Sequence, residues 1–252
     1  MVSTIDDKKL YIFQKGFNYS QDGPGNRLVY HLAGCNLKCP WCSNPEGMTI
    51  TENADTLSPD SIVKEVLSAK MIFIDGGGVT FTGGEVTCQK DAVLSLIKEL
   101  QQNDINTCIE TNASLTGCEE LFSTVDYMIA DFKSPSAEKC KEVLGADIDV
   151  IKSNLICRAK TGKPLLVRVP LVRYFNCGEE DAREFGEFFT ELQSLGTNDD
   201  ISFEILTYHE FGKEKYIKLG KDYTVTDGFT TPDDVKLLAE EIKRRNLKLI
   251  NT

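Results

Sequence analysis

Three cysteines, Cys35, Cys39 and Cys42, are the residues of this sequence whose types and spacing most clearly point to chemistry. They stand four and three positions apart, directly after a short apolar run at 28–32. Thiolates are the soft ligands that iron–sulfur centres use, and a loop of this pitch can hold three irons of a cubane cluster. A ferredoxin normally supplies four cysteines to each cluster. With three, the fourth iron stays open to a substrate or cofactor, just as catalytic zinc sites keep one position open.

A partial zinc site or a chance grouping is the alternative interpretation of these cysteines. The chain has nine cysteines, so some close spacing is expected by chance. A zinc site needs a fourth Cys or His nearby, and the candidate, His31, lies inside the apolar run. The other cysteines show no paired ligand spacing and are interpreted as ordinary thiols. They are Cys88, Cys108, Cys118, Cys140, Cys157 and Cys177.

Composition narrows the classes of partner and compartment. The 252 residues carry 28 Lys and Arg against 39 Asp and Glu, a formal net charge of −11. Such a chain is a poor electrostatic partner for nucleic acid or an anionic membrane. No apolar run approaches the length of a membrane span, and residues 1–10 contain no signal-peptide core. We therefore expect a cytoplasmic protein, a monomer, with reduced cysteines.

The elements that must position the cysteine loop follow an alternating pattern. Strands are expected near 11–13 and at 28–32, 79–82, 107–109, 127–130, 165–169 (ending at Pro170) and 203–206. Helices are expected at 59–73, 92–100, 119–122, 137–159, 179–195 and 232–245. Strands joined by helical crossovers form a parallel sheet. About six such units fall short of the eight that close a full barrel, so the expected fold is an open, partial (β/α)6 barrel, a single domain over 1–252 with its core at about 10–245.

Polar clusters follow the predicted strands at their carboxyl ends, where the active sites of barrels lie. They are GGGVTFTGGE (76–85), ETN (110–112), DFK (131–133) and YH (208–209), and a turn sequence, DGPGNR (22–27), precedes the first core strand. The cysteine motif, with Trp41 before its last cysteine, resembles that of radical S-adenosylmethionine (SAM) enzymes. The five further stretches resemble one branch of that superfamily, the activating enzymes of glycyl radical enzymes. The 45 residues between Cys42 and Cys88 hold no further cysteine, so the chain resembles the compact pyruvate formate-lyase type that has no ferredoxin-like insert.

This resemblance implies an activity. A [4Fe–4S] cluster on the three cysteines would bind SAM through its open iron. One electron, from a flavodoxin- or ferredoxin-type donor, would cleave SAM to a 5′-deoxyadenosyl radical. That radical would take hydrogen from a glycine of a partner glycyl radical enzyme, which implies an anaerobic setting.

One group of residues is assigned to SAM binding, and a second group to the charged side chains and the cation expected beside SAM. Gly83 and Gly84 let the backbone approach SAM closely, and Glu85 can accept charge-assisted hydrogen bonds from its amino group. Lys133 is assigned a catalytic role with the cysteines, as a cation for the SAM carboxylate or the partner backbone. Glu110 and Asp131 are candidate oxygen ligands for a monovalent cation.

The remaining candidates come mainly from the resemblance. Trp41 would shield the cluster near adenine, with simple core burial as the alternative. Asn44 resembles a residue that contacts SAM after the cluster loop. Arg168 lies on a strand where its charge should point into the site, and the methionine end of SAM is a possible partner. His209 would bind the SAM ribose, and a solvent-facing loop histidine is the alternative.

Two rival functions stay open. One is a radical SAM enzyme that acts on a small molecule in cofactor biosynthesis. The other is a non-catalytic metal-binding protein, which zinc instead of iron and sulfide would indicate.

Overall fold

The computed structural model describes residues 9–51, 54–196 and 200–251, and the prediction for the N-terminus falls largely on residues 1–8, outside them. The strands are β1 (Leu10–Tyr19), β2 (Asn26–Leu32), β3 (Asp55–Leu57), β4 (Gly78–Gly83), β5 (Asn106–Thr111), β6 (Tyr127–Asp131), β7 (Leu165–Leu171), β8 (Ile201–Thr207) and β9 (Leu249–Ile250). The helices are α1 (Pro59–Ser68), α2 (Lys90–Gln102), α3 (Glu119–Thr124), α4 (Ala137–Lys139), α5 (Ile148–Ala159), α6 (Glu179–Leu195), α7 (Lys213–Lys218) and α8 (Pro232–Arg244). Short 3-10 turns η1 (Pro45–Met48), η2 (Lys70–Ile72) and η3 (Val86–Gln89) and a π turn η4 (Cys140–Leu144) complete the list.

One curved sheet organises these elements. Its strand order is β3-β1-β2-β4-β5-β6-β7-β8-β9. The run from β2 to β8 is parallel, and β1 and β3 are added antiparallel at one edge. The edge strands β3 and β9 do not pair with each other, so the sheet stays open. This confirms the predicted open, partial (β/α)6 barrel.

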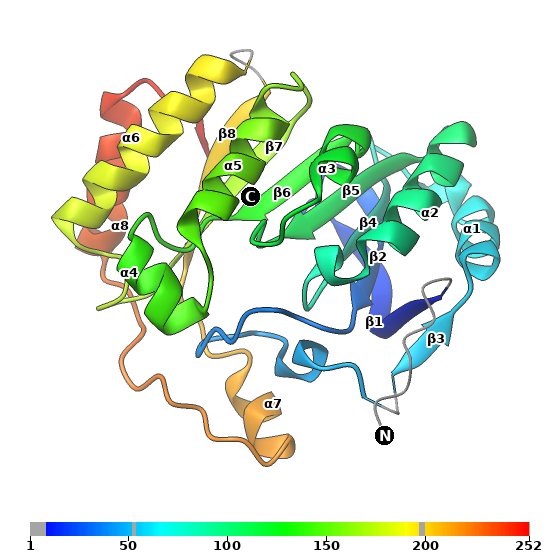
Figure 1. The fold of residues 1–252 in the computed structure, drawn as a ribbon, viewed down its shortest axis with the longest axis horizontal. Coiled ribbons are helices and arrows are strands. Elements are labelled where there is room, and N and C mark those ends of the chain that lie inside the picture. Colours follow the sequence, from blue (N-terminus) through cyan, green and yellow to red (C-terminus); the bar gives the residue numbers. More distant parts are fainter. Residues whose placement is uncertain (1–8, 52–53, 197–199, 252) are drawn as a thin grey trace.

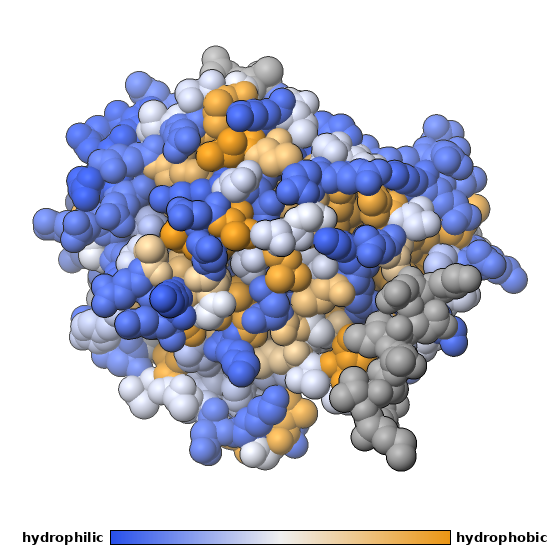
Figure 2. Space-filling view, in the orientation of Figure 1, coloured by the Kyte–Doolittle hydropathy of each residue, from blue (hydrophilic) through white to orange (hydrophobic). Residues whose placement is uncertain are grey.

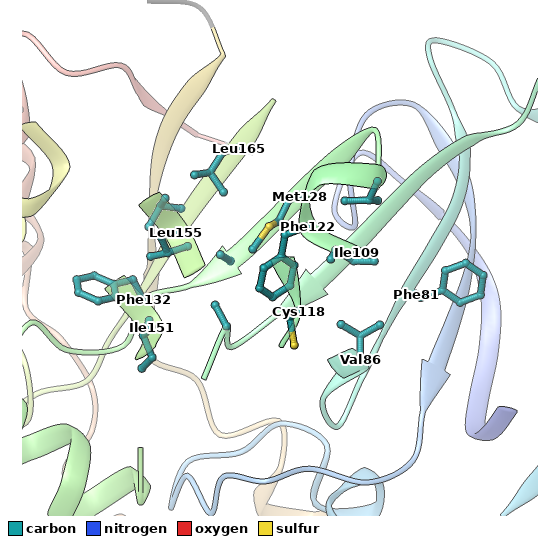
Figure 3. Packing of buried hydrophobic residues seen from close by; sticks show 14 of the residues in the cluster. Phe81, Val86, Ile109, Cys118, Phe122, Met128, Phe132, Ile151, Leu155 and Leu165 are labelled. Carbon is teal, nitrogen blue, oxygen red and sulfur yellow. The ribbon is translucent and has the colours of Figure 1, made fainter. Parts of the chain in front are cut away.

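Helices cover one face of the sheet and bury the main core against it. In Figure 1, α1, α2 and α3 lie over the half around β4 and β5, and α5, α6 and α8 lie over the half around β7 and β8. Figure 3 shows Ile109 and Met128 of the strands beside Phe122 of α3, with Phe81 and Leu155 of the same core on either side of them. Parallel strands buried in this way carry mostly apolar residues on the covered face, although in β5 the buried Thr107 and Thr111 flank Ile109 there.

The inner face of the sheet carries a second, smaller set of side chains. A small apolar cluster faces inward from three neighbouring strands: Cys108, Ile129 and Leu166. Side chains alternate along a strand, so the residues two positions further on face the same way. These are Glu110, Asp131 and Arg168. A charged layer therefore lies on the apolar one, toward the carboxyl ends of the strands.

Some predicted boundaries differ from the structure, among them that of β1, which is longer than the strand expected near 11–13. The helix expected to run to Phe73 ends at Ser68, and η2 follows it, with Met71 91% exposed. The strand expected to end at Pro170 continues to Leu171. Pairing with β6 ends at Arg168, so Pro170 faces a side where no ladder needs its missing N–H.

Arg158 ties α5 to α3 and to the loops before β6 and β7, and it is fully buried. Its guanidinium donates four hydrogen bonds of 2.7–2.9 Å to backbone carbonyls, those of Phe122, Val125, Asp126 and Pro164. Replacing it by methionine leaves these buried acceptors without donors, and we expect a loss of about 3–5 kcal/mol in the free energy of unfolding. The thermal midpoint should fall by roughly 10 °C, measured by calorimetry. Arg183→Met, at a half-exposed surface position, should change it by less than about 2 °C.

The surface is consistent with the acidic composition. Figure 2 shows a face that is largely hydrophilic, with hydrophobic side chains in small groups. Among the described residues, none of the helices has the length and apolar character that crossing a membrane requires.

Candidate active site

The cysteine loop runs from the end of β2 to η1 and is held against the loop after β4. The amide of Gly34 donates to the carbonyl of Gly47 (2.8 Å), and the amide of Glu85 donates to the carbonyl of Gly34 (2.7 Å). A Cβ atom at Gly84 would lie 2.3 Å from that same carbonyl oxygen of Gly34. Only glycine allows this approach, so one function of Gly84 is to bring the two loops together.

All three cysteines of the loop line one cavity of about 250 Å³ at the carboxyl ends of the parallel strands. The cavity is also lined by most of the other residues that the sequence singled out: Trp41, Asn44, Gly83, Gly84, Glu85, Glu110, Asp131, Lys133 and His209. The loops after β2, β4, β5, β6, β7 and β8 all contribute to it. The predicted convergence of the strand-end clusters is therefore present in the fold.

The three thiols are free, and two of them already accept backbone hydrogen bonds. The amides of Leu37 and Asn44 lie 3.4 Å from Sγ of Cys35 and Cys42. Burial raises the pKa of Cys35 and of Cys39 to about 11, although the charge on Lys133 acts in the opposite direction. Amide donors to sulfur and a nearby cation stabilise thiolates that bind iron.

The arrangement of potential ligands bears on which metal these thiols suit. Among the residues that the structure describes, no group of three or more His, Cys, Asp or Glu side chains is placed to hold a metal ion. A zinc ion requires its sulfurs about 2.3 Å away on all sides, whereas a cluster spaces its cysteines around several irons. Three soft thiol donors on one loop suit either an iron–sulfur cluster or zinc.

Glu85 lines the cavity but is only 1% exposed, and its carboxylate accepts hydrogen bonds from two neighbouring loops. Its Oε1 accepts from the amide and hydroxyl of Thr87 (2.9 and 2.6 Å) and from the hydroxyl of Thr111 (2.6 Å). Its Oε2 accepts from the amide of Asn112 (2.7 Å). Burial raises the pKa of Glu85, and these donors oppose that shift. Glu85 thus positions two loops in addition to facing the cavity.

Lys133 and Asp131 form an ion pair on the cavity wall. Lys133 Nζ lies 2.6 Å from Asp131 Oδ2. Burial disfavours the charge on Lys133, but Asp131 and the sulfurs of Cys39 and Cys35 outweigh that effect and raise its pKa. The lysine is therefore cationic and lies beside the cysteine loop, available to an anionic group.

Arg168 points inward, as the sequence predicted. Its side chain is not part of the cavity lining, and its contact with the methionine end of SAM stays a prediction. Its guanidinium pairs with Glu110 (2.7 Å) and Glu204 (2.6 Å). Burial raises the pKa of Glu110, against the lowering effect of Arg168. The inward arginine thus has its partners within the protein.

The other predicted residues lie around the rim. Trp41 packs against Phe175 with ring centroids 4.6 Å apart. Asn44 Oδ1 accepts from Lys215 Nζ at 2.8 Å. His209 stacks on Phe211 at 4.0 Å, and burial lowers its pKa, so it is neutral at pH 7.

Several cavity residues were not predicted as site residues. They are Leu37, Ser43, Thr82, Thr111, Asn112, Pro170, Val172, Leu206, Thr207 and Tyr208. The alternation of side chains along β4 could have predicted Thr82 as a cavity residue, because it faces inward near the carboxyl end of that strand. No local signal identifies Phe175, whose contact with Trp41 joins distant parts of the chain.

The comparisons with known proteins agree with this geometry. Residues 29–189 match the model of the radical SAM superfamily. The chain is similar to the pyruvate formate-lyase-activating enzyme of Staphylococcus aureus, with 32% identity over 225 residues, which cover 84% of this chain and 86% of that enzyme.

Solved structures show the same fold at lower identity. A domain of the pyruvate-formate lyase-activating enzyme from Bacteroides vulgatus matches with a TM-score of 0.56 and 18% identity, over 69% of this chain and 98% of that one. Streptococcus suis SuiB bound to S-adenosylmethionine matches with a TM-score of 0.62 and 18% identity, over 88% of this chain and 48% of that one.

Proposed function

This chain belongs to the radical SAM superfamily, and within it to the family of the pyruvate formate-lyase-activating enzymes; on that basis we propose that it activates a glycyl radical enzyme. The observation that carries this proposal is the cavity in which a three-cysteine loop, a buried glutamate and a lysine–aspartate pair meet at the open end of a parallel sheet. The family implies a [4Fe–4S] cluster and SAM as its cofactors.

The cysteine loop supports this cofactor set. Cys35, Cys39 and Cys42 would hold the cluster, since they are free thiols lining one cavity with amide donors on two sulfurs. When bound together, the reduced cluster and SAM supply a 5′-deoxyadenosyl radical. The chain's own contribution is to bind, orient and exclude water.

The residues around the loop fit the two ends of an amino acid. Glu85 offers carboxylate oxygens to an ammonium group, held in place by the loops at Thr87 and Asn112. Lys133 offers an ammonium to a carboxylate, held by Asp131. Fixed charges of opposite sign on two walls would orient the methionine part of SAM in one direction.

The open sheet supports a macromolecular substrate. A strand-end cavity in an unclosed barrel leaves room at the mouth for a peptide loop. We propose that the partner's glycine loop enters there, and that hydrogen moves from the glycine Cα to the 5′ carbon. The electron would come from a flavodoxin- or ferredoxin-type carrier.

The test is electron paramagnetic resonance of a candidate glycyl radical enzyme after anaerobic incubation with the reconstituted chain, SAM and a reductant. A glycyl radical doublet that depends on SAM is the expected result, and a partner with its glycine replaced by alanine is the control. Formation of 5′-deoxyadenosine with no radical on any candidate partner would instead favour a small-molecule substrate. Zinc in place of iron and sulfide after anaerobic purification would contradict the cofactor assignment.

A further inference from the structure

A layer of charged side chains lies at and beneath the floor of the cavity. Asp131 of β6 is in register with Arg168 of β7, which is in register with Glu204 of β8. Glu110 of β5 faces the same space, and both it and Asp131 line the cavity. Arg168 joins this layer together, with Nη1 2.7 Å from Glu110 and Nε 2.6 Å from Glu204.

Each carboxylate of the layer has a side-chain cation beside it. Asp131 pairs with Lys133, and Glu110 and Glu204 share Arg168. The second oxygen of Glu110 accepts from a threonine hydroxyl at 2.7 Å. The third guanidinium nitrogen of Arg168 donates to the carbonyl of residue 21, in the loop after β1. Each of the three guanidinium nitrogens of Arg168 therefore donates one hydrogen bond within the protein.

Arg168 supplies positive charge to these carboxylates, which a bound metal cation would otherwise have to supply. The side chains of Arg168 and Glu204 are only 7% and 2% exposed, and buried carboxylates need a partner of opposite charge to stay ionised. Carboxylate oxygens are ligands that hard cations take, but here the charges of Glu110 and Asp131 are already paired with Arg168 and Lys133.

We infer that Arg168 is the built-in counter-ion of the cavity floor, so that Glu110 is held in place without a bound monovalent cation. This inference rests on the proposed SAM chemistry, because the floor that Arg168 organises is part of the cavity proposed to bind SAM. Arg168 does not itself line the cavity. It is a positioning residue that acts through Glu110, and it also ties the loop after β1 to β8.

The first test compares the unaltered protein in potassium, sodium and tetramethylammonium salts of equal ionic strength. Tetramethylammonium is too large to replace a coordinated cation. Photoreduced deazaflavin serves as the electron source, so that no sodium dithionite is added. We expect 5′-deoxyadenosine formation to agree within about twofold across the salts. A loss of more than about tenfold in tetramethylammonium, restored by potassium or sodium, would overturn the inference.

The second test asks whether removing the charge of Arg168 makes the protein depend on a bound monovalent cation. Arg168→Gln removes the charge, and we expect its thermal midpoint and its 5′-deoxyadenosine formation to rise when potassium or sodium replaces tetramethylammonium. Arg168→Lys keeps a cation and should stay indifferent to the salt. Arg158→Gln is the matched control: another buried arginine, but bonded to backbone carbonyls, so its midpoint should fall equally in all salts.

The outcomes separate this inference from the proposed function. An Arg168→Gln protein that folds and is as indifferent to the salt as Arg158→Gln would overturn the inference. If Arg168→Gln does not fold, the comparison of the unaltered protein decides. Absence of 5′-deoxyadenosine in every salt would contradict the proposed function, while the salt dependence of the midpoints would still decide the role of Arg168.

Discussion

Replacing Cys39 by alanine is expected to abolish both iron–sulfur absorbance and SAM cleavage. Cys39 is the most buried of the three loop cysteines, and its sulfur is proposed as a direct ligand of the cluster. Loss of a direct ligand should exceed the roughly 10–100-fold cost of losing an outer partner of a metal site. Iron and sulfide analysis and 5′-deoxyadenosine quantification, after anaerobic reconstitution, measure the effect.

A second cysteine serves as the matched control for this change. Cys157 on α5 is also a free, partly buried thiol, but it is not part of the cavity lining. Cys157→Ala should keep the iron and sulfide content and the rate of SAM cleavage of the unaltered protein. Retention of a cluster and of SAM cleavage in Cys39→Ala would remove the assignment of the three cysteines, and with it the proposed function.

The parts of the fold that sequence could predict are those set by local periodicity. Apolar or β-branched runs of three to five residues separated by amphipathic segments identify strands and crossovers. The polar residues that end each run must then meet at one edge of the sheet. For that reason Glu85, Glu110, Asp131 and His209, at or just after the ends of four different strands, could be expected in one cavity from the sequence.

The parts that could not be predicted depend on contacts between distant segments. Alternation predicts that Arg168 points inward, but its partners Glu110 and Glu204 are 58 and 36 residues away, and sequence does not say which acceptor the guanidinium selects. Helical periodicity likewise continues past Ser68 through Met71, although that side chain finds nothing to pack against. Periodicity gives the direction of a side chain, and tertiary packing gives its partner.

Glu85 combines these two kinds of information, because its position at a strand end was predicted and its role in holding two loops was not. Glu85→Ala is expected to weaken SAM binding by about a hundredfold or more. A hydrogen bond to a charged group contributes about 1.5–3 kcal/mol, and a hundredfold corresponds to about 2.8 kcal/mol. The substitution also leaves the buried amides of Thr87 and Asn112 without acceptors, so the loops that line the cavity should move. Anaerobic calorimetric titration of the reconstituted protein with SAM measures the effect.

Two further variants separate charge from shape at this position. Glu85→Gln keeps the shape, but its amide nitrogen must face either the amide of Asn112 or the donors from Thr87 and Thr111, so one set of hydrogen bonds is lost. We expect its affinity for SAM to lie between those of Glu85→Ala and the unaltered protein. Glu65→Ala is the control, since that carboxylate lies on α1 and accepts from Tyr30 away from the cavity. Affinity for SAM that changes by less than about twofold in Glu85→Ala would show that this carboxylate neither binds the cosubstrate nor positions the loops that do.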